Sequence, residues 1–234
     1  NSFASGSGAV AKGSNTIAIG AGATAANISS ISASERLQVL SNDYQISAGA
    51  IRRKQIDADF SDGQNLIAIG ADAQAIGINA TALGSNSVAS GEAAVALGTT
   101  SQAIGINAIA VGTASQAQKG NGIAMGQDAR AISIDSTSIG KQSVASGRNS
   151  MALGTEARTT GHRSVALGTK SKATGTYSAA IGTKSSATGF QSTAIGFGAE
   201  AYRDNEIAVG TRASRYRLRG LAPGSGFVGS KYQN

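Results

Sequence analysis

Residues 161–174 read GHRSVALGTKSKAT, and residues 175–188 read GTYSAAIGTKSSAT. They are successive copies of one 14-residue unit, in which a short apolar segment ending in glycine precedes a polar segment containing small residues. The glycine that ends the apolar segment recurs every 14 residues, eleven times without a slip, from Gly70 to Gly210. A repeat held in register over this length indicates a solenoid, in which each unit stacks on its neighbours.

Each unit predicts two short strands joined by two tight turns. The residue before each repeat glycine is Ile, Leu, Val or Met, and the residue two before it is Ala except at Ser138. Small residues stand three and five positions after the glycine with polar residues between them, an alternation typical of a strand. Gly seven positions on and Asn or Asp nine positions on suit turns with positive φ. Because 14 residues cannot hold the helix of a β-α-β crossover, we predict an all-β, parallel β-solenoid with coils about 4.8 Å apart.

Alternation along the strands predicts which side chains face the interior. We expect the aliphatic residues one and three positions before the glycine to lie inside, facing the Ala and Ser residues three and five positions after it. The Ala two before each glycine is then exposed, and a continuous Ala stripe is most simply explained as a subunit interface of a parallel homotrimer. The predicted interface residues are Ala82, Ala96, Ala110, Ala124, Ala152, Ala166, Ala180, Ala194 and Ala208.

The repeat divides the chain into four parts. Residues 1–26 hold the first repeat, and residues 63–210 hold the continuous series. Residues 27–62 are predicted to be an insertion at a turn, with a short helix at 33–40 and a basic spot at Arg52, Arg53 and Lys54. This insertion has two open interpretations, a ligand-binding projection and a clamp onto a neighbouring subunit. Residues 211–234 lie beyond the last repeat.

The residue types argue against an enzyme. The chain has no cysteine and a single histidine, His162, which stands at a turn of one repeat with no counterpart in the others. A catalytic triad would depend on that one residue, and the thirteen acidic residues are scattered, so we expect no cofactor and no metal site. No apolar run is long enough to span a bilayer as a helix, so a membrane anchor is expected outside this sequence.

Positive charge is the sequence feature that bears on ligands. The formal net charge is +7, and basic residues gather in the second half. Such a surface favours anionic glycans or acidic protein surfaces, without predicting specific nucleic-acid binding, while an ordinary solvated face is the alternative. The candidate ligand surface comprises Arg52, Arg53, Lys54, Arg158, Lys170, Lys172 and Lys184.

The repeated Ser-Val-Ala-Leu-Gly blocks, with Ala three and five positions after the glycine, resemble the YadA-like heads of trimeric autotransporter adhesins over residues 13–27 and 63–210. The resemblance implies a left-handed β-roll, a parallel homotrimer and a place on the bacterial cell surface, anchored in the outer membrane through a stalk. It also implies adhesion to host matrix proteins such as collagen, fibronectin or laminin. The segment after the repeats is similar to the family's neck, with candidate neck residues Arg215, Arg217, Leu218, Arg219, Leu221, Ala222 and Gly224.

Two other functions stay open at this point. A rod of this kind could be a spacer without a ligand, because fold alone does not fix function. An ice-binding β-solenoid would share the short repeat, and Thr recurs one position after the glycine, as at Thr99 and Thr113, but the sequence contains no paired Thr-x-Thr array.

Overall fold

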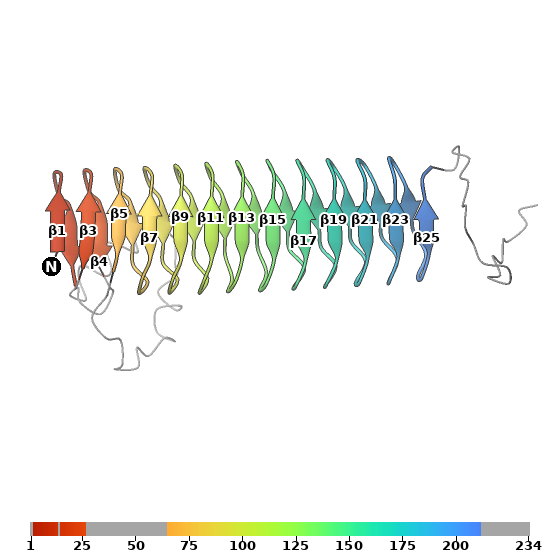
Figure 1. The fold of residues 1–234 in the computed structure, drawn as a ribbon, viewed down its shortest axis with the longest axis horizontal. Helices are drawn as coiled ribbons and strands as arrows, with labels where there is room; N and C mark the ends of the chain where they lie inside the picture. The colour runs from red at the N-terminus through yellow and green to blue at the C-terminus, as the bar shows by residue number, and fades with distance from the viewer. Residues whose placement is uncertain (1, 14, 27–64, 212–234) are drawn as a thin grey trace, which may run out of the picture.

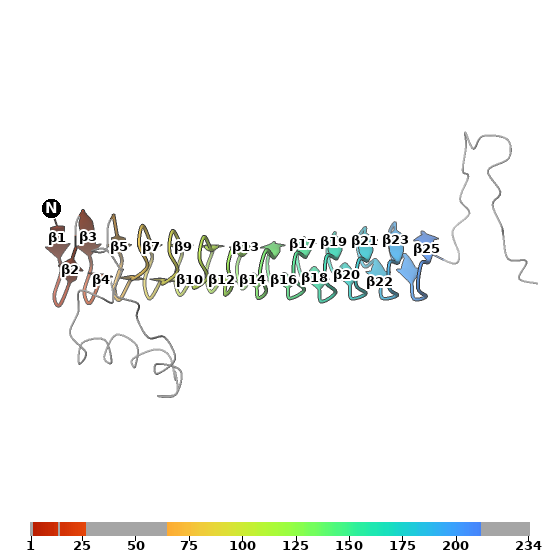
Figure 2. The same cartoon turned by 90° about the horizontal axis from the view of Figure 1, so that it is seen from below.

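The computed structural model describes residues 2–13, 15–26 and 65–211. These residues form a straight rod of stacked coils, in which each coil contributes one strand to each of two parallel sheets (Figures 1 and 2). The described residues contain no helix. The prediction of an all-β, parallel β-solenoid is therefore confirmed, while the left-handed sense of the coil stays a prediction.

Sheet A has thirteen strands and sheet B has twelve, and within each sheet the strands follow one another in chain order. Sheet A contains β1 (Ser2–Ser5), β3 (Thr16–Ile19), β5 (Ile67–Ile69), β7 (Thr81–Leu83), β9 (Val95–Leu97), β11 (Ile109–Val111), β13 (Ile123–Met125), β15 (Thr137–Ile139), β17 (Met151–Leu153), β19 (Val165–Leu167), β21 (Ala179–Ile181), β23 (Thr193–Ile195) and β25 (Ile207–Val209). Sheet B contains β2 (Val10–Lys12), β4 (Thr24–Ala26), β6 (Gln74–Ala75), β8 (Val88–Ala89), β10 (Gln102–Ala103), β12 (Gln116–Ala117), β14 (Arg130–Ala131), β16 (Val144–Ala145), β18 (Arg158–Thr159), β20 (Lys172–Ala173), β22 (Ser186–Ala187) and β24 (Glu200–Ala201).

The strand register follows the sequence repeat. Ala110 on β11 lies beside Ala96 on β9 and Ala124 on β13, each one repeat away. On β3, Ile17 pairs with Ile67 of β5, so the two strands are neighbours in sheet A although the intervening sequence is longer than one repeat. The coil before residues 27–64 and the coil after them therefore stack as adjacent coils, as Figure 1 shows for β3 and β5.

The interior of the rod is filled almost entirely by Ala and Ser. Ala82 of β7 and Ala75 of β6 are fully buried, as are Ala80 and Ala73, which directly precede these strands. The same columns are buried in most other coils. Leu66 is the one fully buried large aliphatic residue among those described. The prediction that small residues three and five positions after the glycine lie inside is confirmed, and the polar residues between them, such as Arg158, lie outside.

The predicted orientation of sheet A is wrong. The Ala residues two before each glycine face the interior of their own chain, and the aliphatic residues on either side of them face outward. Eight of the nine predicted interface residues have no exposed surface, namely Ala82, Ala96, Ala110, Ala124, Ala152, Ala166, Ala180 and Ala194, and Ala208 is half-buried. The alternation along sheet A was correct, but the two sheets of so short a coil lie too close together to enclose two rows of large side chains.

Buried hydroxyl groups are all satisfied within the described residues. The hydroxyl of Ser171 donates to the carbonyl oxygen of Gly168 at 2.8 Å, and the same bond recurs in other coils that carry Ser three positions after the glycine. At Ser138, which replaces the usual Ala, the hydroxyl pairs with that of Ser143 at 2.7 Å. Polar atoms therefore enter this narrow core only where a partner lies in the same coil.

The repeat glycine is required by both its backbone conformation and its neighbour. Gly154 has φ of 131°, in the left-handed region that disfavours side chains. A Cβ atom at Gly154 would also overlap the carbonyl group of Gly168 in the next coil. Because the strand ladder fixes the distance between coils, this overlap cannot be relieved locally.

We expect Gly154→Ala to lower the free energy of unfolding by at least about 2 kcal/mol, because it combines backbone strain with a clash. Gly198→Asn is the matched control, since Asn86 has φ of 55° at the equivalent position and a change within about 0.5 kcal/mol is expected. Urea unfolding followed by circular dichroism measures both values. Equal stability of the Ala variant and the parent chain would contradict the close coil stacking.

The width of the interior gives a second prediction. Ala103→Leu places a large side chain between the sheets and should lower the free energy of unfolding by about 1–3 kcal/mol or more, because it overpacks the core. Gln102→Leu adds a Leu to the outer face of the same strand, and it should change stability by no more than about 0.5 kcal/mol. The same unfolding measurement applies, and an Ala103→Leu variant as stable as Gln102→Leu would show that the core has room to spare.

Candidate interaction surfaces

The outer side of sheet A is a continuous apolar surface. It is formed by the side chains one and three positions before each repeat glycine, from β3 to β25, and we call it the apolar face. These side chains are apolar except for Thr81, Thr137 and Thr193. Leu83 and Leu167 each retain 44% of their surface exposed, and Ile207 retains 72%. Other exposed members are Ile17, Ile19, Met125, Ile139, Met151, Ile181, Ile195 and Val209. At the usual strand spacing of about 4.8 Å, these twelve strands carry the apolar face along about 50 Å of the rod.

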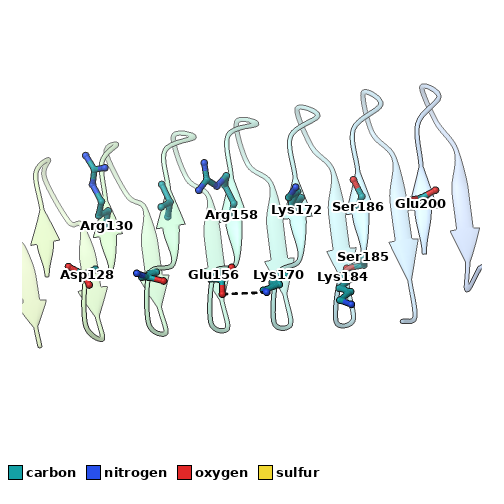
Figure 3. Close-up of a pocket in the computed structure, with 12 residues that line it drawn as sticks. Asp128, Arg130, Glu156, Arg158, Lys170, Lys172, Lys184, Ser185, Ser186 and Glu200 are labelled. Atoms are coloured by element: carbon teal, nitrogen blue, oxygen red, sulfur yellow. Dashed lines mark ion pairs between the residues drawn. The ribbon is translucent and has the colours of Figure 1, made fainter. Parts of the chain in front are cut away.

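A groove runs lengthwise between the turn that follows each repeat glycine and the outer side of sheet B (Figure 3). Its volume is about 1000 Å³, and it is open to solvent. One row of lining side chains comes from the turns, two positions after the glycine, and the other row comes from sheet B, four positions after it. The groove is lined by Asp128, Arg130, Gln142, Val144, Glu156, Arg158, Lys170, Lys172, Lys184, Ser185, Ser186 and Glu200.

The groove brings together four of the residues predicted as a ligand surface. Arg158, Lys170, Lys172 and Lys184 all line it. The sequence analysis did not include Arg130 in the ligand surface. Arg130 stands four positions after its repeat glycine, as Arg158 and Lys172 do, so the repeat alone predicts that it belongs to the same row. Arg52, Arg53 and Lys54 lie outside the described residues, as do all the candidate neck residues.

Charges in the groove are mostly exposed and weakly paired. The ammonium nitrogen of Lys170 lies 3.6 Å from the Oε1 atom of Glu156, and each side chain is about half exposed. Solvent and salt screen such a pair, so it contributes little to stability. No ion pair of Arg158, Lys172 or Lys184 occurs within the described ranges. Arg158 and Lys172 are therefore available to an anionic ligand. The ammonium nitrogen of Lys184 lies 5.7 Å from the centre of the Phe197 ring, a contact that leaves its positive charge without an acidic partner.

The opposite edge of the rod carries a small cluster of basic and aromatic side chains. The guanidinium Nη1 of Arg163 donates to the hydroxyl of Tyr177 at 2.8 Å, and its central carbon lies 5.6 Å from the centre of that ring. Phe190 packs edge-on against Tyr177, with 5.9 Å between ring centres. Arg148, Asn149 and His162 line the same shallow hollow of about 330 Å³. No group of His, Cys, Asp and Glu able to hold a metal occurs in the described part of the chain.

Polar side chains stack between coils on this edge. The amide of Asn107 donates to Asn121 at 3.3 Å, and Asn121 donates to Asp135 at 2.9 Å. Each of these residues has φ of 55° at the same turn position, nine after the repeat glycine. This ladder supports the turns, which explains the recurrence of Asn and Asp at this position without a ligand.

In the residues that the structure describes, no helix is both long enough and apolar enough to cross a membrane.

The family model for the YadA head domain repeat matches residues 1–31, 62–87, 75–101, 103–129, 131–157, 160–185 and 187–213, well over half of the chain. The chain belongs to the YadA head family. It is therefore an adhesin-type head domain, and the family is a class of adhesins rather than of enzymes.

Among solved structures, the chain is similar to the crystal structure of the collagen-binding domain of the Yersinia adhesin YadA. The sequence identity is 28% and the TM-score is 0.42, over 70% of this chain and 76% of that chain. No curated protein matches the chain.

Proposed function

We propose that this chain is the ligand-binding head of a trimeric adhesin on the bacterial cell surface. Three parallel rods bury their apolar faces around a common axis, and their remaining faces contact host extracellular matrix. Membership in the YadA head family and the apolar face of this chain both support the proposal. The neck and the outer-membrane anchor predicted from the sequence belong to the same proposal.

The observation that carries the proposal is the length of the apolar face. Soluble monomers rarely leave a contiguous apolar patch of more than a few hundred Å² in contact with water. Here Ile, Leu, Val and Met side chains extend along twelve strands, and residues such as Leu83, Leu167 and Ile195 are each more than a third exposed. A second and third copy of the same chain offer an apolar surface of the same length and repeat, because all copies share one strand spacing.

In this interface, the Ala residues predicted from the sequence are replaced by the large aliphatic residues on either side of them on the same strands. The subunit contact stays on sheet A, but the side chains that make it are the large ones beside the Ala residues. Large aliphatic side chains bury more apolar surface per residue than Ala, at about 25 cal/mol per Å². An interface formed by them is therefore more stabilising than the one predicted from the sequence.

In this proposal, the surfaces that the trimer leaves exposed bind the host ligand. The outer side of sheet B and the groove are polar and extended, without a deep enclosed pocket. Such surfaces suit many weak contacts, and three copies on one rod raise the overall affinity through avidity. Collagen is the first ligand to test, because a collagen triple helix is itself a long repetitive rod that can lie along such a surface. Fibronectin and laminin are further candidates.

No observation favours ice binding. The Thr residues one position after the glycine form a column, but Gln127 and Lys141 interrupt it between Thr113 and Thr155. A regular flat Thr array is therefore missing from the middle of the rod.

Leu167→Lys should convert the trimer into monomers, because it places a charge within the apolar face, on β19, away from either end of the rod. Light scattering should give the parent chain a mass of about 70 kDa, three times the 23.1 kDa chain, and the variant a mass near that of one chain. Ser186→Lys, on the outer side of sheet B, is the control and should leave the mass at the trimer value. A monomeric parent chain would contradict the proposed assembly.

Binding to immobilised collagen, fibronectin and laminin tests the adhesive role. We expect the parent chain to bind at least one of them, and the monomeric Leu167→Lys variant to bind about 100-fold more weakly, because it loses avidity. Circular dichroism establishes that the variant is folded. A folded trimer that binds none of the three proteins, nor any host cell surface, would instead identify a spacer.

A further inference from the structure

We infer that the groove beside sheet B binds a linear anionic polysaccharide lying parallel to the long axis of the rod. This inference goes beyond the proposed function, because the groove is built by one chain and its ligand is not a protein. Its failure would leave the trimeric assembly and the binding of matrix proteins untouched.

The strand ladder arranges the basic side chains in a row. Arg158 on β18 pairs in register with Lys172 on β20, so their side chains leave the same side of sheet B one strand spacing apart. Arg130 on β14 belongs to the same row, separated from Arg158 by Val144. Lys170 and Lys184 form a second row from the turns on the other side of the groove, as Figure 3 shows. Positive charges therefore recur along the axis at intervals of about 4.8 Å or multiples of it.

The acidic residues leave the centre of the groove positive. Five basic and three acidic side chains line the groove, so its net charge is +2. Asp128 and Glu200 belong to the first and last coils that line it, and Glu156 is paired with Lys170. Arg158, Lys172 and Lys184 lie between them. A chain of anionic groups is attracted to such a line, and the open groove admits it without desolvating the basic side chains fully.

The solenoid itself does not require basic residues at these positions. In the first half of the rod, the same row of sheet B carries Gln74, Val88, Gln102 and Gln116. Those coils have the same strand pairing as the coils of the groove, and the same columns of buried small residues, in which Ser138 and Thr159 replace Ala within the groove. The basic residues of the second half therefore add a surface property to a fold that is complete without them.

The lining chemistry favours a polysaccharide over a nucleic acid. Single-stranded nucleic acids bind mainly by stacking successive bases on aromatic side chains. Phe197, beside Lys184, is one exposed ring and not a row of rings, and no aromatic residue is among those that line the groove. Gln142 and Ser186 instead offer hydrogen-bonding groups suited to sugar hydroxyls. A single phosphate or sulfate would need donors that converge on one point, whereas these donors are spread along a line. Sulfate and carboxylate groups on a polysaccharide share the required chemistry.

The test compares two triple variants with equal charge. Arg158→Gln, Lys172→Gln and Lys184→Gln together remove the positive charges at the centre of the groove. Gln already occupies the row of Arg158 and Lys172 in the first half of the rod, and Gln142 occupies the turn row of Lys184. Lys119→Gln, Arg148→Gln and Arg163→Gln remove the same charge from the exposed turns of the opposite edge. Calorimetry or biolayer interferometry at about 150 mM salt, where the Debye length is about 8 Å, measures binding of a size-defined heparin oligosaccharide. Thermal unfolding and light scattering show that both variants keep the parent's fold and mass.

We expect the groove variant to bind heparin at least about 10-fold more weakly than the parent chain. The control variant should change by less than about 2-fold, since its charges lie on the opposite edge of the rod and salt screens them. Hyaluronan, which carries carboxylates only, and a single-stranded DNA of matching charge are measured alongside. Binding of heparin alone identifies a sulfated polysaccharide, and binding of both polysaccharides shows that carboxylates suffice. No heparin binding by the parent chain, equal losses in both variants, or DNA binding as tight as heparin binding would each overturn the inference.

Discussion

The narrow space between the two sheets is the constraint on which the rest of this structure depends. A coil of 14 residues folds back so tightly that Ala and Ser fill its interior, and Leu66 is the single fully buried large aliphatic residue among those described. Such a core buries little apolar surface per coil, so each coil gains little from the hydrophobic effect alone. Stability must come from repetition, because every coil forms two parallel ladders with each neighbour and even the turns are paired. The amide of Glu156, for example, donates to the carbonyl oxygen of Lys141 in the preceding coil at 2.8 Å.

The same constraint determines where the large aliphatic residues go. Since they do not fit between the sheets, Ile, Leu, Val and Met on sheet A face outward and form the apolar face. The surface that would make a monomer prone to association is thus a direct consequence of a thin core. Assembly with further copies is the simplest way to cover it, because the interface then has the same repeat and length as the rod. In the proposed trimer, subunit packing supplies the large hydrophobic contacts that a globular domain makes inside one chain.

The outer side of sheet B is constrained neither by the narrow core nor by the proposed subunit interface. Its side chains neither fill the core nor belong to the apolar face, so they can change from coil to coil while the ladder stays intact. Gln102 and Gln116 give way to Arg130, Arg158 and Lys172 along one row, with no change in strand pairing. The turns behave similarly, since the position nine after the glycine holds Asn107 in one coil and Tyr177 in another at similar positive φ. Substitutions on the outer side of sheet B and in the turns can therefore change ligand specificity without altering the fold.

The sequence by itself determined the period, the two strands per coil, the parallel stacking and the positions of the turns. These features depend only on residues at fixed offsets, and the recurrence of Gly154, Gly168 and Gly182 fixes those offsets without ambiguity. The gathering of Arg158, Lys170, Lys172 and Lys184 was also predictable, because a repeat converts sequence offset directly into position along the rod.

Only the tertiary structure decided which side of sheet A faces inward. Alternation defines two sets of side chains on opposite faces of the sheet, such as Ala166 in one set and Val165 with Leu167 in the other. It does not determine which of the two sets faces the interior. The usual preference for burying large aliphatic residues then selects the wrong set. The distance between the sheets reverses that preference, and this distance is a property of the closed coil rather than of any one strand.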